Sequence, residues 1–368
     1  MTIEDLKTRL RHRIQTQGPI SIADYMASCL TDPTAGYYTT RDPFGQKGDF
    51  ITAPEVSQMF GELIGAFFLQ AYERMGSPDH FQLVELGPGR GTLMADLLRM
   101  ASLRPKFINA ANLTLVEMSL KLQKIQTKTL SKSPLRPGFA EQFDQVADGP
   151  VLLIANEFFD ALPIHQFVKT PNGWVERMVG LNETGDLAFG LGTGRLSDRD
   201  IPATALGAAD GAILETQPAS NAIAEAIGHR IKEHGGAALF IDYGYLKSAP
   251  GDTLQAIRKH AFDDVLANPG KADITAHVNF GALASACHQA GSIFCPPLEQ
   301  GEFLLRLGLL ERAGVLGNGK SHKQQETIRN DVERLAAPDK MGQLFKVLAV
   351  SDTSAPLAPF DPATQGKQ

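Results

Sequence analysis

The stretch that decides the fold of this 368-residue chain is Val84-Glu85-Leu86-Gly87-Pro88-Gly89-Arg90-Gly91-Thr92. An apolar run, Phe81 to Leu86, leads into the glycines and predicts a strand, and the amphipathic run Thr92 to Leu103 behind them predicts a helix. Glycines at such a turn let the backbone bend tightly and approach a ligand without a clash from a Cβ atom. The stretch therefore predicts a strand–loop–helix unit whose loop lies against a bound small molecule.

The spacing of the loop and its flanking acids narrow the class of ligand. The pattern is G-x-G-x-G, which differs from the G-x-G-x-x-G of dinucleotide binders. Glu85 ends the strand, and its carboxylate suits an ammonium or sulfonium group better than a pyrophosphate. Glu117 closes the next predicted strand, 113–116, where it could accept hydrogen bonds from ribose hydroxyls. A tight turn without a ligand and an NAD-type site remain as alternatives.

A second group of polar residues, Asn156 to Pro163, directly follows the apolar run Val151 to Ala155. In open α/β sheets, ligands bind at the carboxyl ends of the strands. We expect Asn156 to orient an acceptor, and Glu157 and Asp160 to bind a cationic one such as a guanidinium group. The alternative is a plain helix N-terminus, because Asn156 and Asp160 are both suitable caps.

Weaker candidates lie further along the chain. His277, near an expected helix start, is either a catalytic group or a structural histidine. Asp242 and Tyr243 end another buried run, so they either line the same crevice or form a plain turn. Glu302 follows Gln300 and either contributes an acid to the pocket or caps a helix. The predicted catalytic residues are Asn156, Glu157, Asp160 and His277.

Alternating strand and helix patterns organise most of the chain and predict a Rossmann-like α/β fold with a mainly parallel sheet. We expect an N-terminal helical cap over residues 1–77, with a helix from Thr52 to about Arg74, and a main domain over 78–350, with a helix over 302–314. Three strand-like runs between about 164 and 191, separated by good turn sequences, predict an antiparallel β-meander inserted into that domain. Residues 351–368 contain three prolines and few apolar residues, which predicts a disordered tail.

Composition excludes several classes of protein. With 43% hydrophobic and 21% charged residues and a net charge of -6, the chain lacks the basic balance of a general nucleic-acid binder. Its apolar runs are far shorter than the roughly 18–20 residues needed to span a bilayer. The three cysteines show no paired spacing, so we expect neither a disulfide framework nor a metal site. We expect no signal peptide and a reducing compartment, most simply a bacterial cytoplasm.

These segments together resemble the MidA family, bacterial relatives of the mitochondrial complex I assembly-factor methyltransferases. The resemblance is carried by Gly48 to Glu62, the loop 85–91, Asn156 to Pro163, Asp273 to Phe280 and Gln300 to Leu304. It implies a class I methyltransferase fold, with S-adenosylmethionine as cofactor and with Asp49, Thr52, Ser57 and Gln58 over the cofactor or acceptor. The predicted cofactor-binding residues are Asp49, Thr52, Ser57, Gln58, Glu85, Gly87, Gly89, Gly91, Glu117 and Asn156.

The resemblance also implies an activity and a partner. Mitochondrial members methylate an arginine of a complex I subunit, which implies a protein substrate here, and the mitochondrial matrix if the chain is a processed eukaryotic member. Two other functions stay open: a non-catalytic assembly chaperone that retains the fold, and an NAD-dependent oxidoreductase. The sequence does not identify the acceptor protein or the number of methyl groups, and a homodimer is compatible with it.

Overall fold

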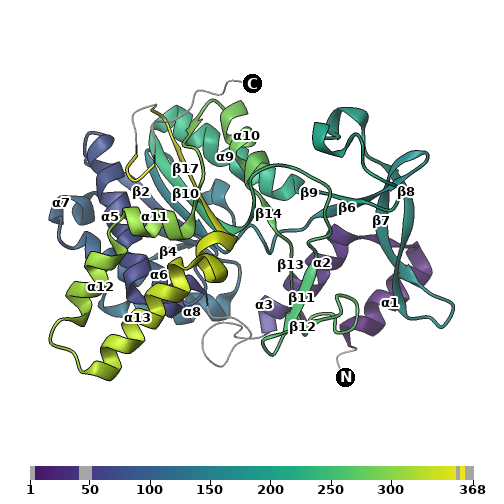
Figure 1. Ribbon diagram of the computed structural model, residues 1–368, viewed down its shortest axis with the longest axis horizontal. Coiled ribbons are helices and arrows are strands. Elements are labelled where there is room, and N and C mark those ends of the chain that lie inside the picture. Colours follow the sequence, from purple (N-terminus) through teal and green to yellow (C-terminus); the bar gives the residue numbers. More distant parts are fainter. Residues whose placement is uncertain (1–4, 41–51, 354–356, 361–368) are drawn as a thin grey trace. The chain divides into compact units, whose positions relative to one another are not determined.

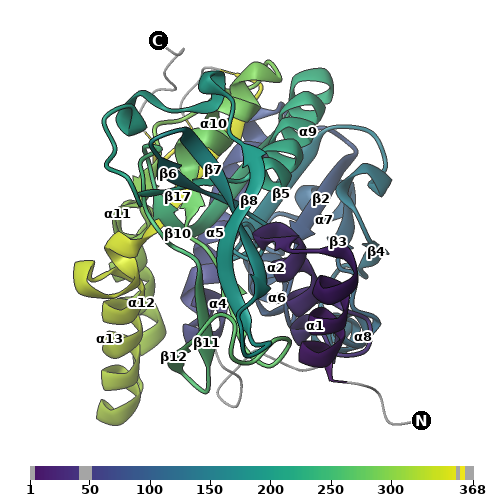
Figure 2. The ribbon, with the colours of Figure 1, turned by 90° about the vertical axis from the view of Figure 1, so that its right-hand side faces the viewer.

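The computed structural model describes residues 5–40, 52–353 and 357–360 and divides the chain into two compact units (Figures 1 and 2). The first unit comprises residues 1–50, 160–221 and 247–279, and the second comprises 51–159, 222–246 and 280–368. Each unit is therefore built from three separate stretches of the chain. The sequence predicted a boundary at residue 77, whereas residues 51–77 group with the second unit.

A mixed, mostly parallel sheet forms the centre of the second unit (Figure 1). Its order is β15 (Ile293–Phe294), β17 (Phe345–Ser351), β10 (Gly236–Tyr245), β5 (Val151–Asn156), β2 (Phe81–Leu86), β3 (Ala111–Val116) and β4 (Gly138–Ala140). The five strands from β10 to β4 run parallel, and β17 pairs antiparallel with β10, β15 and β16 (Leu298–Glu299). This topology confirms the predicted Rossmann-like class I methyltransferase sheet.

Helices cover both faces of this sheet because successive side chains of a strand point to opposite faces. Leu239 and Ile241 of β10 share one core cluster with α5 (Gln58–Arg74), α6 (Thr92–Ala101) and α11 (Gln300–Arg306). Phe240 points to the other face, where its ring lies 5.0 Å from that of Phe159. Further helices of the unit are α7 (Pro105–Ala110), α8 (Leu120–Thr129), α9 (Pro218–His234), α10 (Phe280–Gln289), α12 (Leu309–Gly317) and α13 (His322–Ala336).

Two helices predicted as continuous are interrupted. The helix expected from Thr52 onward is split into α4 (Ala53–Val56) and α5, because Ser57 adopts an extended conformation with φ -157° and its hydroxyl caps α5 by accepting from Met59 N. The helix expected over 302–314 is split into α11 and α12 by Gly308, whose φ of 93° is left-handed. Both breaks are local backbone events that hydrophobic periodicity does not reveal.

Within its described residues, the first unit contains two antiparallel sheets and the helices α1, α2 and α3. The larger sheet has the order β1 (Ile20–Ser21), β7 (Gly173–Leu181), β6 (His165–Thr170), β9 (Ile213–Thr216), with β8 (Leu187–Arg195) paired to β7. Its strands β6, β7 and β8 confirm the predicted antiparallel meander. The smaller sheet has the order β12 (Ala261–Asp263), β11 (Gln255–Arg258), β13 (Asp273–Thr275), which the sequence analysis did not predict.

Where the structure describes the end of the chain, the residues are ordered, in contrast to the disordered tail expected from the sequence. Ser351 ends β17, and Leu357 and Phe360 are buried in the core of the second unit. The Phe360 ring lies 5.5 Å from that of Phe303, so two apolar residues of this stretch contribute to the core.

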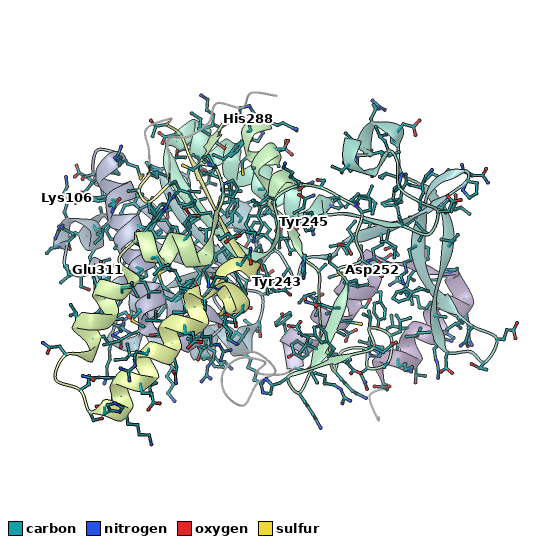
Figure 3. All side chains as sticks on the ribbon, viewed as in Figure 1. Lys106, Tyr243, Tyr245, Asp252, His288 and Glu311 are labelled. Carbon is teal, nitrogen blue, oxygen red and sulfur yellow. The ribbon has the colours of Figure 1, made fainter. Side chains whose placement is uncertain are left out.

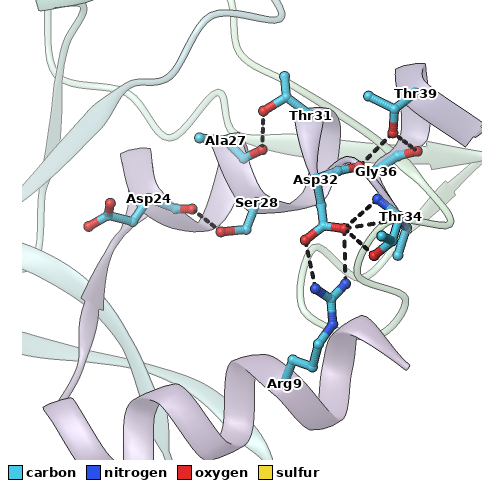
Figure 4. A network of polar contacts seen from close by, with 10 residues as sticks. Arg9, Asp24, Ala27, Ser28, Thr31, Asp32, Thr34, Gly36 and Thr39 are labelled. Carbon is cyan, nitrogen blue, oxygen red and sulfur yellow. Dashed lines mark hydrogen bonds and ion pairs between the residues drawn. The ribbon is translucent and has the colours of Figure 1, made fainter. Parts of the chain in front are cut away.

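A polar network in the first unit ties α1 (Leu6–Gln17) to the end of α2 (Ile22–Thr31) (Figure 4). Arg9 donates two hydrogen bonds to the carboxylate of Asp32, at 2.9 and 3.0 Å. Asp32 Oδ1 also accepts from Thr34 N, Thr34 Oγ1 and Ala35 N. The guanidinium of Arg9 and these donors hold the pKa of Asp32 well below its ordinary value. The network therefore stabilises the turn that leads into α3 (Tyr37–Thr40).

Replacing Arg9 by methionine is expected to destabilise the first unit by about 1–2 kcal/mol at pH 7, because a bidentate pair of a partly exposed arginine is lost. Because the folded-state pKa of Asp32 is depressed, this contribution is present above pH ~4 and is lost as the pH falls below it. Urea unfolding of both proteins across this range measures the difference. Arg13→Met is the control, because Arg13 lies on the same helix but makes a single 3.6 Å contact with Asp24; an equal loss in both variants would contradict the prediction.

Candidate functional site

The carboxyl ends of three neighbouring strands bring the main predicted site residues together in the second unit. β2 lies between β3 and β5, and Leu86 is in register with Val116 on one side and Ala155 on the other. Glu85, Glu117 and Asn156 therefore end adjacent strands at one edge of the sheet. This edge is where ligands bind in open α/β sheets.

The glycine loop that follows β2 requires its glycines. Gly87, Gly89 and Gly91 have φ values of 60°, 52° and 79°, a left-handed region that other L-residues rarely adopt. A Cβ atom on Gly87 would lie 2.9 Å from Cδ2 of Phe158, so the ring of that residue closes one side of the loop. The packing of Phe158 on Gly87 links the loop after β2 to the turn after β5.

Three buried polar atoms around the loop have no hydrogen-bond partner among the described residues: Glu85 Oε2, Gln126 Oε1 and Asn156 Oδ1. Glu85 is only 3% exposed, and burial alone raises its pKa to about 8. A buried polar atom without a partner is costly, so such atoms mark places where a ligand or water completes the site. The unmatched carboxylate calls for a cationic ligand group.

Gln126 is a functional candidate that the sequence analysis missed. It is fully buried on α8, and its Nε2 donates to Gly89 O at 2.8 Å and to Glu117 Oε2 at 3.1 Å. Glu117 Oε1 accepts from Ser119 N at 2.7 Å, and burial raises the pKa of Glu117. Gln126 thus connects the glycine loop to the acid after β3. The available signal was its position four residues after Leu122, on the buried face of the same helix.

The turn after β5 is held from two sides. Glu157 has φ 50°, and its N–H donates to Ile241 O at 2.9 Å. The N–H groups of Phe158 and Phe159 donate to Oδ2 of the fully buried Asp242, at 3.1 and 3.0 Å. Asp242, for which a crevice residue and a plain turn were both expected, therefore holds this turn in place. Glu157 Oε1 accepts from Ala53 N at 3.0 Å and from Asn156 Nδ2 at 3.3 Å.

The segment that the resemblance placed over the cofactor is described in part. Asp49 lies outside the described residues. Thr52 occupies the N-cap position of α4 without a side-chain capping hydrogen bond to any residue the structure describes. Ser57 caps α5, and Gln58 Nε2 donates to Glu62 Oε1 at 3.1 Å. Their predicted contacts with a cofactor stay predictions.

Two predicted catalytic residues lie in the first unit. Asp160 is buried, and its carbonyl accepts from Ala276 N at 3.0 Å. His277 is half-buried, its N–H donates to Thr253 Oγ1 at 2.9 Å, and burial lowers its pKa. Their backbones are thus joined through Ala276, and their catalytic roles stay predictions.

Two weaker candidates have structural contacts. Gln300 is fully buried, and its Nε2 donates to Leu335 O at 2.9 Å, which anchors the end of α13. Glu302 pairs with Arg306 one helical turn away. Tyr243, labelled in Figure 3, belongs to β10 near its carboxyl end. Its ring lies 5.6 Å from that of Phe345. The ion pair is a structural contact of Glu302, whereas Gln300 Oε1 is buried without a hydrogen-bond partner among the described residues.

Comparison with known proteins decides the family. Residues 63–296 match the model of a family described as "Putative S-adenosyl-L-methionine-dependent methyltransferase". The chain belongs to this family. The match includes the glycine loop, Glu117 and Asn156, and it confirms the resemblance drawn from the sequence. The protein is thus an S-adenosylmethionine-dependent methyltransferase.

Relatives with names extend the comparison. The chain is 37% identical to the protein arginine methyltransferase NDUFAF7 homolog, mitochondrial, of Drosophila melanogaster, over 94% of this chain and 84% of that protein. It is 38% identical to the mouse protein arginine methyltransferase NDUFAF7, mitochondrial, over 93% and 83%. A crystal structure from Burkholderia thailandensis, bound to S-adenosyl-homocysteine, is 27% identical with a TM-score of 0.85, over 98% of this chain and 95% of that one.

The residues present in this methyltransferase fit its cofactor. A Cβ atom on Gly87 would meet the Phe158 ring, and Glu85 Oε2 is buried without a hydrogen-bond partner among the described residues. Within the described ranges, the chain has no helix of the length and apolar character needed to cross a membrane.

Proposed function

We propose that the crevice formed by Glu85, the glycine loop, Glu117 and Asn156 holds S-adenosylmethionine, and that the enzyme methylates an arginine side chain of a protein. The observation that carries the proposal is the set of three buried polar atoms around the loop that have no partner in the described part of the chain, Glu85 Oε2, Gln126 Oε1 and Asn156 Oδ1. Their positions at the ends of adjacent parallel strands support a single site.

Each residue of the crevice has a chemical counterpart in the cofactor. The carboxylate of Glu85 would pair with the ammonium of the methionine part, which removes the cost of burying an unmatched charge. Glu117 would accept from ribose hydroxyls while Gln126 holds its other oxygen in place. The left-handed glycines would let backbone N–H groups approach the cofactor closely.

The cofactor supplies an electrophilic methyl group on its sulfonium, and the chain contributes position and a dry surrounding. Asn156 Oδ1, buried and unpartnered among the described residues, would accept a hydrogen bond from a donor on the acceptor or the cofactor. The ring of Phe158, which packs next to Gly87, would exclude water from one side of the loop. Positioning of this kind supplies much of the rate acceleration when two reactants must meet in line.

An arginine acceptor is supported by the names of the relatives, both of which are protein arginine methyltransferases. A guanidinium stays protonated in water and carries five donors, so an arginine acceptor requires a site that orients it and lets one proton leave. By the same resemblance, we propose a complex I-type subunit as the protein that carries the arginine.

Transfer of tritium from methyl-labelled S-adenosylmethionine tests this function. The purified enzyme is incubated with protein extract from cells that lack its gene, and labelled proteins are hydrolysed to amino acids. We expect label in methylated arginine, and none when Glu85→Ala replaces the intact enzyme. Label in another amino acid would contradict the arginine acceptor, and binding of the cofactor without any label would favour an assembly chaperone.

A further inference from the structure

We infer that Glu157 is a positioning residue whose carboxylate holds α4 against the turn after β5. Its carboxylate does not take a proton from the side chain that receives the methyl group. The inference rests on the proposed cofactor crevice, because the fastened turn also carries Asn156 and Phe158. It differs from the expectation of the sequence analysis, which assigned the carboxylate of Glu157 to catalysis.

The backbone of Glu157 explains why its side chain reaches α4. A glutamate at φ 50° is unusual, because the left-handed region is unfavourable for residues with a Cβ atom. The conformation is maintained by Ile241 O, which accepts the Glu157 N–H, and by Asp242, which accepts the next two N–H groups. Strain that its surroundings maintain is typical of functional sites, and here it directs the side chain toward Ala53.

The contact with Ala53 satisfies a buried donor. Ala53 is fully buried, and as the first residue of α4 its N–H has no partner within that helix. Glu157 Oε1 accepts this N–H at 3.0 Å and also accepts from Asn156 Nδ2 at 3.3 Å. A single oxygen thus orders both the start of α4 and the amide of Asn156, and through Asn156 it determines where Oδ1 of that residue is held.

A second contact fastens α4 to the other loop of the crevice. Thr92, the first residue of α6 after the glycine loop, donates through its hydroxyl to Glu55 Oε1 at 2.6 Å. Residues 53 and 55 of one short helix therefore contact the turn after β5 and the loop after β2. Neither hydrogen bond involves the transfer of a proton. The contact between Glu157 and Ala53 requires only an oxygen that accepts a hydrogen bond.

The two possible roles of Glu157 have different requirements. Positioning needs only an oxygen that accepts a hydrogen bond, whereas base catalysis needs the carboxylate. Glutamine keeps the amide Oε1, which accepts a hydrogen bond from Ala53 N. It cannot remove a proton from the side chain that receives the methyl group. Alanine removes both functions. Glu157→Gln is therefore the matched variant that preserves positioning and abolishes base catalysis.

The experiment measures hydrogen–deuterium exchange of the peptide spanning residues 52–57, the dissociation constant of S-adenosylhomocysteine, and turnover, for the intact enzyme, Glu157→Gln and Glu157→Ala. We expect Glu157→Ala to exchange faster at this peptide and to bind about tenfold more weakly or worse, since a buried donor is left unpaired. We expect Glu157→Gln to stay within about threefold of the intact enzyme in all three measurements.

The outcomes also separate this inference from the proposed function. If Glu157→Gln keeps normal exchange and normal affinity but loses turnover at least about 100-fold, the carboxylate acts in catalysis and the inference is overturned. If Glu157→Ala leaves exchange at residues 52–57 unchanged, the fastening is absent, which also overturns it. Thr92→Val, with Thr92→Ser as its control, is expected to raise exchange at the same peptide through the Glu55 contact. Failure of the intact enzyme to bind S-adenosylhomocysteine would instead contradict the proposed crevice.

Discussion

Gly87→Val is expected to weaken the binding of S-adenosylhomocysteine at least ~100-fold while the chain stays folded. Valine is β-branched and poorly tolerates the φ of 60° at this position, so the loop must rearrange. Its Cβ would also lie 2.9 Å from Cδ2 of Phe158, which would displace the ring that closes one side of the loop. Isothermal titration of the purified variant measures the loss, and circular dichroism verifies folding.

Gly185→Val is the matched control for this variant. Gly185 also has a left-handed φ, 78°, and a Cβ atom there would meet no described heavy atom within 4 Å. It lies in the turn between β7 and β8 of the first unit, so valine costs similar backbone strain there and leaves the glycine loop of the second unit unaltered. Equal loss of affinity in both variants would mean that general destabilisation, and not the shape of the loop, explains the result.

Affinity for S-adenosylhomocysteine is expected to rise about tenfold per pH unit between pH 6 and 8 and then level off. In the free enzyme the pKa of Glu85 is about 8, so its carboxyl group is mostly protonated at neutral pH. The ammonium of the ligand favours the ionised form, and binding must therefore release close to one proton at pH 7. Titration in two buffers with different ionisation enthalpies measures that proton.

Glu85→Gln serves as the control for the pH dependence. Glutamine keeps the size of the side chain but cannot ionise, so this variant is expected to bind weakly at every pH with most of the slope removed. Burial also raises the pKa of Glu117, which this variant retains. Glu117 therefore accounts for the pH dependence that remains. An unchanged slope in Glu85→Gln would show that Glu85 does not face the ligand's ammonium.

The sequence predicted those parts of the fold that depend on local patterns. Strands such as Val151–Asn156 are apolar runs, and the glycine loop is a local turn, so both could be located from neighbouring residues alone. The breaks at Ser57 and Gly308 could not, because helical periodicity continues across them. Pairing of β9 with β6 was also missed, since it joins residues 165–168 to 213–216.

The candidate site shows the same division. Glu85, Glu117 and Asn156 were predicted because each follows a recognisable strand. Gln126 was missed because its relation to the loop arises only in the fold: it reaches Gly89, 37 residues earlier in the chain. Glu157 was identified as a site residue, but its contact with Ala53 spans 104 residues and changes the role that we propose for it.

Titration of the intact enzyme with S-adenosylhomocysteine and, separately, with NAD⁺ shows which cofactor the enzyme binds. We expect binding of S-adenosylhomocysteine at one site per chain, with release of a proton at pH 7, and no binding of NAD⁺. Binding of NAD⁺, or S-adenosylhomocysteine binding that Gly87→Val leaves intact, would show that the crevice formed by Glu85, the glycine loop and Glu117 is not the cofactor site.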